Sequence, residues 1–306
     1  MKKRILIVGS LNMDIVMEMK CMPKKGETIL GESLTYSPGG KGANQAFAAG
    51  MLGGNAMMLG CVGRDSMGDQ LRENMQKSGT DISGIAQVEN KPTGVAAIYV
   101  DENGDNSIVV ISGANSICDA TYLKQNDDLF KQSDYVLFQM EIPAEAVYYG
   151  IRRAKELGKT VILNPAPAPD GLPADILQKI DYLTPNETET LKLSGLTEMS
   201  EESLLTGAEE LLKKGVKNVI VTMGDKGALL VNDEGKNLYP TRKVKAVDTT
   251  AAGDCFNAAF AVGLSEGMSH EEAIRFANTA SSISVTRKGA QGSIPSRKEV
   301  DAVVLS

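Results

Sequence analysis

The chain has 306 residues, a length that suits two average domains or one large α/β domain. Hydrophobic residues make up 42% and charged residues 23% of it, a balance that excludes collagen-like, fully disordered and coiled-coil architectures. Lys and Arg number 32 against 39 Asp and Glu, giving a net charge of -7. Nucleic acid is therefore not an expected partner, because proteins that bind its phosphate backbone carry a basic surface.

No apolar run approaches the ~18 residues that a membrane helix needs, so no membrane partner is expected. The apolar stretch at residues 5–8 is too short for a signal peptide and indicates a first buried strand. The four cysteines form no CxxC pair, which argues against a zinc knuckle and favours a reducing, cytoplasmic location. The only histidine, His270, follows Ser269 at the expected exposed start of a helix, a surface setting rather than a catalytic one.

Strand-like apolar runs alternate with amphipathic helical runs along most of the chain. Strands are predicted at 5–8, 95–100, 107–111, 135–139, 160–163, 182–184, 218–222 and 228–231. Helices are predicted at 44–53, 68–78, 121–132, 144–157, 187–194, 201–214, 253–267 and 270–284. This order predicts an α/β fold with a mostly parallel sheet covered on both faces, and ligands at the carboxyl ends of its strands.

Two segments, about 10–36 and about 90–112, do not follow this alternation. Both are rich in strand-forming residues, and the second contains the turn Glu102-Asn103-Gly104-Asp105, which is typical of a hairpin. Together they predict a small accessory sheet that serves as a lid or as an oligomer contact.

Neither a Walker A loop nor a GxGxxG motif occurs, so any nucleotide phosphate must be bound in another way. The best candidate is the stretch 247–260, where small residues crowd a turn before an amphipathic helix. Free N–H groups and the dipole at a helix start attract anions. Asp254 lies at the same place and is interpreted either as a plain helix cap or as a base that accepts a hydroxyl proton.

Two further elements could bind a polyol. The run Gly39-Gly40-Lys41-Gly42 is interpreted as a flexible, donor-rich loop that binds an anion or a polyol, or else as a glycine turn with a solvated lysine. Asn12 and Asp14 point the same way along an extended chain, which suits vicinal hydroxyls, although an exposed turn fits them as well.

Taken together, these stretches resemble the ribokinase / phosphofructokinase-B family of carbohydrate kinases, over nearly the whole chain. The matching stretches are GSLNMD at 9–14, GGKGANQA at 39–46, GRD at 63–65 with Gly68, NPAP at 164–167, NETE at 186–189, TMGDKG at 222–227, DTTAAGD at 248–254 and VTRKGA at 285–290. The GGKGAN form resembles the ribokinase branch rather than the adenosine kinases or fructokinases. Ala251 stands where many members carry glycine, but alanine is also small.

The resemblance implies a ribokinase-like three-layer sandwich, with a central mostly parallel sheet and a small β-sheet lid, formed by residues 1–306 as one domain. It implies Asp254 as the base and a backbone anion hole at Ala251, Ala252 and Gly253. The residues implied in sugar binding are Asn12, Asp14, Gly40, Lys41, Asn44, Glu141 and Asp254. Those implied in ATP binding are Asn186, Thr222, Gly224, Gly227, Gly253 and Asn278.

The same resemblance implies two kinds of metal ion. Glu189 would help to hold Mg²⁺ through water. The implied ligands of a potassium ion are Asp248, Thr250, Ser284, Arg287, Gly289 and Ser293, several of them through backbone carbonyls. Phosphoryl transfer needs positioning and neutralisation of charge more than covalent chemistry, which agrees with such a site.

The activity expected from the resemblance is the ATP-dependent phosphorylation of D-ribose at O5, in a homodimer formed through the β lid. The alternatives are a related deoxyribose, fructose or adenosine kinase, or a non-catalytic sugar-binding regulator on the same scaffold. A nucleoside site needs aromatic or apolar surface for the base, and the chain has no Trp and only six Phe. Intact Asp254, Lys41 and Asn186 argue against the regulator.

Overall fold

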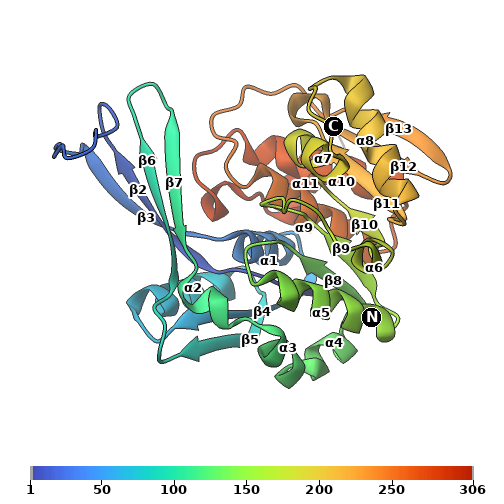
Figure 1. The fold of residues 1–306 in the computed structure, drawn as a ribbon, viewed down its shortest axis with the longest axis horizontal. Helices are drawn as coiled ribbons and strands as arrows, with labels where there is room; N and C mark the ends of the chain where they lie inside the picture. The colour runs from blue at the N-terminus through green and yellow to red at the C-terminus, as the bar shows by residue number, and fades with distance from the viewer. Residues whose placement is uncertain (1–2, 305–306) are drawn as a thin grey trace.

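The computed structural model describes residues 3–304, which form two separate β-sheets and the helices around them (Figure 1). The strands of the larger sheet are β1 (Arg4–Val8), β4 (Asn55–Gly63), β5 (Asp81–Val88), β8 (Tyr135–Phe138), β9 (Thr160–Leu163), β10 (Tyr182–Leu183), β11 (Asn218–Thr222), β12 (Ala228–Asn232) and β13 (Gly235–Tyr239). Their order is β13-β12-β11-β10-β9-β8-β1-β4-β5. Only the pairs β11–β12 and β12–β13 are antiparallel, so the sheet is mostly parallel as predicted.

Helices cover both faces of this sheet. They are α1 (Lys41–Met51), α2 (Ser66–Lys77), α3 (Ala120–Gln125), α4 (Asp127–Gln132), α5 (Ala144–Glu156), α6 (Ala174–Leu177), α7 (Glu187–Ser194), α8 (Glu201–Lys213), α9 (Ala252–Ser265), α10 (His270–Ser284) and α11 (Arg297–Val304). Successive side chains of β1 point to opposite faces: Ile5 and Ile7 join the core with α1, α9 and α10, and Leu6 and Val8 join the core with α5 and α8. The predicted three-layer α/β sandwich is therefore confirmed.

The smaller sheet projects from the body, at the left of Figure 1. It consists of β2 (Asn12–Glu18), β3 (Ser33–Gly39), β6 (Gly94–Val100) and β7 (Asn106–Ile111), in the order β3-β2-β6-β7. The strand-rich segments at about 10–36 and 90–112 thus supply one accessory sheet, although β3 continues past residue 36 to Gly39. Its register places Asp14 of β2 between Ser37 of β3 and Ala96 of β6.

Some predicted elements differ from the structure. The single helix predicted at 121–132 is two short helices, because the chain turns at Asn126, whose side-chain amide donates to the Tyr122 carbonyl. β4, β5, β13, α6 and α11 were not predicted. The Ser269 cap is confirmed as a capping box with Glu272, but His270 is half-buried and lies 2.9 Å from the Tyr182 hydroxyl.

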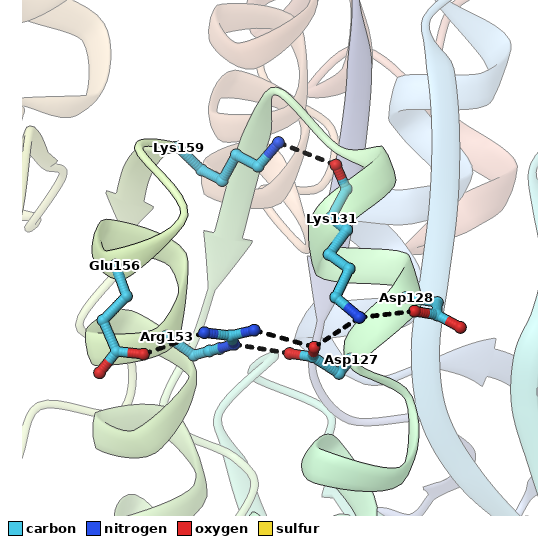
Figure 2. A network of polar contacts seen from close by, with 6 residues as sticks. All are labelled: Asp127, Asp128, Lys131, Arg153, Glu156 and Lys159. Atoms are coloured by element: carbon cyan, nitrogen blue, oxygen red, sulfur yellow. Dashed lines mark hydrogen bonds and ion pairs between the residues drawn. The ribbon is translucent and has the colours of Figure 1, made fainter.

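A polar network joins α4 to α5 (Figure 2). The Arg153 guanidinium contacts both carboxylate oxygens of Asp127, at 2.6 and 2.9 Å, and Lys159 donates to the Lys131 carbonyl. The hydrogen bonds from Arg153 hold the pKa of Asp127 at about 2. Gly158-Lys159-Thr160 matches the ending of a Walker A loop, but it lies between α5 and the start of β9, and its lysine makes a structural contact with α4.

None of the helices between residues 3 and 304 has the length and apolar character needed to cross a bilayer. The four cysteines are all free thiols, and only Cys21 is exposed.

Candidate active site

The first turn of α9 lies at the centre of the site. Its N-cap, Ala251, has a φ of 59°, and it is the one residue other than glycine with a positive φ in the part of the chain that the structure describes. A left-handed backbone strains every residue that has a Cβ, so it favours glycine here for a reason other than small size. The small size of alanine therefore does not remove the whole cost of replacing glycine.

The backbone amides of this turn differ in their hydrogen-bond partners. Within residues 3–304, the N–H groups of Ala251 and Gly253 donate to no protein acceptor, whereas that of Ala252 donates to the Thr249 carbonyl at 3.2 Å. A Cβ built on Gly253 would meet nothing within 4 Å, so this residue faces open space. Two of the three predicted anion-hole residues therefore offer free donors in this conformation, and Ala252 does not.

Asp254 points away from that opening, toward α1. Its side chain is only 6% exposed. Its two carboxylate oxygens accept hydrogen bonds from the amides of Asn44 and Gln45, each at 2.9 Å. Burial raises the pKa of Asp254, and the charge of Lys41 together with the two amides opposes this effect. The group is thus a desolvated carboxylate with fixed hydrogen-bond partners, which does more than cap a helix.

The glycine-rich run at 39–42 brings α1 close to the accessory sheet. The prediction of a flexible loop here is wrong: Gly39 ends β3, Gly40 is the N-cap and Lys41 is the first residue of α1. A Cβ on Gly39 would lie 2.1 Å from an oxygen of Asp14, and one on Gly40 would lie 2.7 Å from the Asn12 nitrogen. The glycines are therefore needed so that the backbone can approach the predicted sugar-binding side chains.

The charged residues of this region interact strongly. Burial, and then the charges of Glu141 and Asp254, raise the pKa of Asp14 to about 7, and Lys41 partly opposes this rise. Burial alone would lower the pKa of Lys41, but Asp254, Glu141, Glu189 and Asp14 together raise it above its ordinary value. Lys41 is therefore a firmly protonated cation among carboxylates, and its ammonium group makes no hydrogen bond within residues 3–304.

Several residues that the sequence analysis did not select support this cluster. The Asn115 amide donates to the Asn12 side-chain oxygen at 2.7 Å, and its own oxygen accepts from the Leu11 N–H. The Ser10 hydroxyl donates to Glu141 at 2.6 Å, and the Lys41 backbone N–H donates to the same oxygen at 3.0 Å. No local motif marks Asn115, because it lies in a 3₁₀ turn far along the chain.

A cavity of about 770 Å³ opens on the other side of the first turn of α9. It is lined by all six residues predicted for the nucleotide, namely Asn186, Thr222, Gly224, Gly227, Gly253 and Asn278. Asn186 and Thr222 pair side by side at the carboxyl ends of β10 and β11, where an α/β sheet binds its ligands. A Cβ on Gly227 would lie 2.1 Å from the Tyr239 carbonyl, so this position requires glycine.

Glu189 forms a capping box with Asn186 at the start of α7. Its carboxylate accepts from the Asn186 N–H, and the Asn186 side chain accepts from the Glu189 N–H, each at 2.8 Å. Burial raises the pKa of Glu189, and the Asn186 hydrogen bond and Lys41 oppose this. One carboxylate oxygen, Oε1, has no protein partner among the described residues and could receive a metal-bound water.

The predicted potassium ligands gather around the segment 284–293. The Asp248 carboxylate accepts from the N–H groups of Thr250 and Gly289, at 2.9 and 2.8 Å. The Ser284 hydroxyl is fully buried and has no hydrogen-bond partner. In residues 3–304 no group of three or more His, Cys, Asp or Glu side chains could hold a metal ion, so an ion here would depend on hydroxyls, carbonyls and one carboxylate.

Two of these positions have other partners. The Arg287 guanidinium pairs with Glu299, and the Ser293 hydroxyl donates to the Ala290 carbonyl at 2.8 Å. Only the backbone carbonyl of Arg287 and the oxygen lone pairs of Ser293 could therefore face an ion. A hard monovalent cation fits such an oxygen-only donor set, and the orphaned Ser284 hydroxyl is consistent with it.

The open α/β sheet carries a large cavity, a helix start with free amides, and a buried carboxylate beside a polar cluster. This combination is typical of enzymes that transfer a group from one substrate to another. The model of the pfkB family of carbohydrate kinases matches residues 2–297. The chain therefore belongs to this family, and it is an enzyme that phosphorylates a sugar.

Individual relatives agree with the family. The chain is 41% identical over 299 residues to the ribokinase of Haemophilus influenzae, and the alignment covers 98% of this chain and 97% of the relative. It is 37% identical over 292 residues to a deoxyribokinase of Salmonella typhi, with 95% of each chain covered. Among solved structures, that of the ribokinase of Arabidopsis thaliana complexed with ribose and ATP is similar with a TM-score of 0.94 and 35% identity, over 99% of both chains.

Proposed function

We propose that the chain transfers the γ-phosphoryl group of ATP to O5 of D-ribose, giving D-ribose 5-phosphate and ADP. The observation that carries this proposal is the position of Asp254. Its carboxylate lies in the first turn of α9, between the cavity that Gly253 faces and the polar cluster of Asn44, Lys41 and Asp14. The relatives named as ribokinases, one of them complexed with ribose and ATP, support the choice of substrates.

In this mechanism the polar cluster holds the sugar and Asp254 takes the proton of its attacking hydroxyl. The O5–phosphorus bond forms as the bond between the γ-phosphorus and the bridging oxygen breaks, and ADP leaves. The free amides at the start of α9 and the protonated Lys41 stabilise the charge that spreads over the transferring group. Asn12 and Asp14 supply an amide donor and a carboxylate acceptor for the other hydroxyls.

Two metal ions belong to the proposal. Glu189 would hold Mg²⁺ through water, and the ion would neutralise charge on the ATP phosphates. The oxygen donors around Ser284 and Asp248 would hold a potassium ion and thereby add positive field at the start of α9. Replacing potassium with tetramethylammonium should lower turnover, and unchanged turnover would reject the cation site.

The sequence leaves the identity of the sugar open, and deoxyribose is the second candidate because of the Salmonella typhi relative. A coupled assay over pentoses, hexoses and nucleosides separates the alternatives. Ribose should give the highest kcat/KM. A higher value for deoxyribose or fructose would make that sugar the substrate in place of ribose. No turnover with any sugar would favour a non-catalytic regulator. A nucleoside preference would contradict the lack of aromatic surface.

The role of Asp254 is tested by Asp254→Asn, with Asp233→Asn, an exposed turn carboxylate, as the matched control. The amide keeps the shape of the side chain but cannot accept a proton. Turnover should fall by at least ~10²-fold, the scale expected for loss of a general base. ATP binding by calorimetry and the melting temperature should stay close to those of the control; near-native turnover would overturn the mechanism.

A homodimer through the accessory sheet is also part of the proposal. β7 is an edge strand on which Ile108, Val109, Val110 and Ile111 are each more than half exposed, and Leu34 and Tyr36 of β3 are exposed as well. Apolar surface of this extent on one sheet is typical of an interface. Light scattering should give the mass of a dimer, and Val109→Ser with Ile111→Ser should shift it to the monomer.

The free thiols support a reducing compartment, and a cytoplasmic location is proposed on that ground.

A further inference from the structure

Side-chain amides surround the Asp254 carboxylate, and those in direct contact with it are themselves held by other amides. On one side, the Gln45 amide donates to Oδ1 of Asp254 at 2.9 Å, and the oxygen of Gln45 accepts from the Gln139 amide at 2.5 Å. On the other side, Asn44 donates to Oδ2, and the oxygen of Asn44 accepts from Gln291 at 3.2 Å. Each carboxylate oxygen therefore accepts a hydrogen bond from an amide whose orientation is fixed by a second amide.

Gln45 and Gln139 have no exposure to solvent at all. Gln45 also reaches the side-chain oxygen of Asn164, at 3.2 Å, from the same nitrogen. An unconstrained glutamine amide could rotate by half a turn and present its oxygen to Asp254, which would repel the carboxylate. The Gln139 donor prevents this, because it requires the oxygen of Gln45 to point toward Gln139.

The position of Gln139 is in turn fixed by close packing. Its oxygen is buried and has no hydrogen-bond partner among residues 3–304, and a Cβ on Gly9 would lie 2.0 Å from it. An unsatisfied buried acceptor is costly, so a glutamine kept only for packing would be replaced by an apolar residue at no loss. What the second glutamine provides here is the donor to Gln45.

We propose that Gln45, backed by Gln139, is a positioning residue that holds the Asp254 carboxylate ionised and aimed at the sugar hydroxyl. This inference rests on the proposed function of Asp254 as the base. Amides neither release nor take up protons near neutral pH, so the two amides that hold Asp254 do not compete with the sugar hydroxyl as proton donors. Apart from the bond from Gln45 to Asp254 itself, neither glutamine amide makes a hydrogen bond to a residue predicted for the sugar or the nucleotide.

The charged groups that face Asp254 decide how its titration responds. They are Lys41 of α1, Glu141 after β8, Asp14 of β2 and Glu189 of α7, with the Cys255 thiol beside it. None of them changes when Gln45 is replaced. Because a hydrogen bond donated to the ionised form lowers the pKa of a carboxyl, loss of the Gln45 amide should raise it further.

The test is the pH profile of kcat at saturating ribose and ATP in Gln45→Met and Gln139→Met, because Asp14, whose pKa is about 7, can also change the KM for ribose with pH. Asn232→Leu is the matched control: it removes a buried amide that bonds to Asn218 at the opposite end of β11. In Gln45→Met the acidic limb should move up by about one pH unit and turnover at neutral pH should fall about tenfold. Gln139→Met should shift the limb in the same direction by less, and the control should not shift it.

The outcomes separate this inference from the proposed function. If Asp254→Asn keeps its turnover, the base itself is wrong and the glutamines have nothing to position. If Asp254→Asn is inactive but both glutamine variants keep the acidic limb of the unaltered protein and lose only thermal stability, as the control does, the glutamines are structural and the inference is overturned. Should Gln45→Met not fold, the limb measured in Gln139→Met decides alone.

Discussion

The titration of Asp14 offers a sharp test of how the sugar is held. Burial and the neighbouring charges of Glu141 and Asp254 raise the pKa of Asp14 to about 7, from an ordinary value of 3.8. The folded protein therefore keeps this carboxyl protonated at a pH where it would be ionised in the unfolded chain. Only the ionised form accepts hydrogen bonds with both oxygens, so sugar binding should weaken as the pH falls through about 7.

The size of the effect follows from the pKa. Each pH unit below it lowers the ionised fraction about tenfold, so between pH 8 and pH 5.5 the KM for ribose should rise by about one order of magnitude or more. The KM for ATP should change much less, because Asp14 does not line the nucleotide cavity. Steady-state kinetics across this range, with both substrates varied, measure the two constants.

Two variants identify the group that titrates. Asp14→Asn should bind ribose as weakly at pH 8 as the unaltered protein does at pH 5.5, and its KM should no longer depend on pH. Glu141→Gln removes a like charge, so the midpoint of the remaining dependence should move to lower pH. A flat KM in the unaltered protein, or a slope that survives in Asp14→Asn, would refute the reasoning.

Three further predictions concern other parts of the chain. Ala251→Gly should raise the free energy of unfolding by up to about 1 kcal/mol in urea titrations, because it relieves the left-handed backbone; a decrease would contradict this. Asn115→Leu should raise the KM for ribose about tenfold and leave that for ATP unchanged, since it frees the Asn12 amide to rotate. Arg153→Met should lower the free energy of unfolding at neutral pH, as measured by urea titration. The ionised Asp127 stabilises the fold fully above pH 3.8, so the loss of stability in the variant should shrink as the pH falls from 3.8 to about 2. A loss that does not depend on pH would exclude the ion pair as its cause.

Elements with strong local signals could be predicted from the sequence to the residue. Helix α7 begins and ends where expected, because its capping box and the left-handed Gly195 that follows it are both local features. β9 and β11 also match, since short apolar runs between turns need no knowledge of the rest of the fold. The six nucleotide positions were implied by the family resemblance instead, and the structure brings all of them to one cavity.

Elements that depend on tertiary context could not be predicted in this way. β4 contains Gly60 and Gly63 and two methionines, a composition with little intrinsic strand preference. It becomes a strand because it is buried between β1 and β5, and other elements of the chain separate it from each of them. α1 begins earlier than predicted for a similar reason: Gly40 caps it only when β3 delivers the chain beside Asn12.

The supporting residues of the site were missed because their roles depend on partners far away in sequence. Gln45 is separated from Gln139 by 94 residues and from Asp254 by 209. A glutamine on a buried helix face carries no signal of either contact. Motifs therefore point to the groups proposed to touch substrates, whereas the amides that contact those groups emerge only from the fold.

The start of α9 also resolves a conflict that the sequence raised, namely why a carboxylate lies beside an anion site. Successive residues of a helix point about 100° apart, so neighbours in one turn can serve different surroundings. Gly253 faces the nucleotide cavity with a free amide, whereas Asp254 faces α1 and the amides of Asn44 and Gln45. In the proposed mechanism, phosphate would meet donors on one side of the turn and the sugar hydroxyl would meet an acceptor on the other, so the two like charges would not share a pocket before the reaction brings their substrates together.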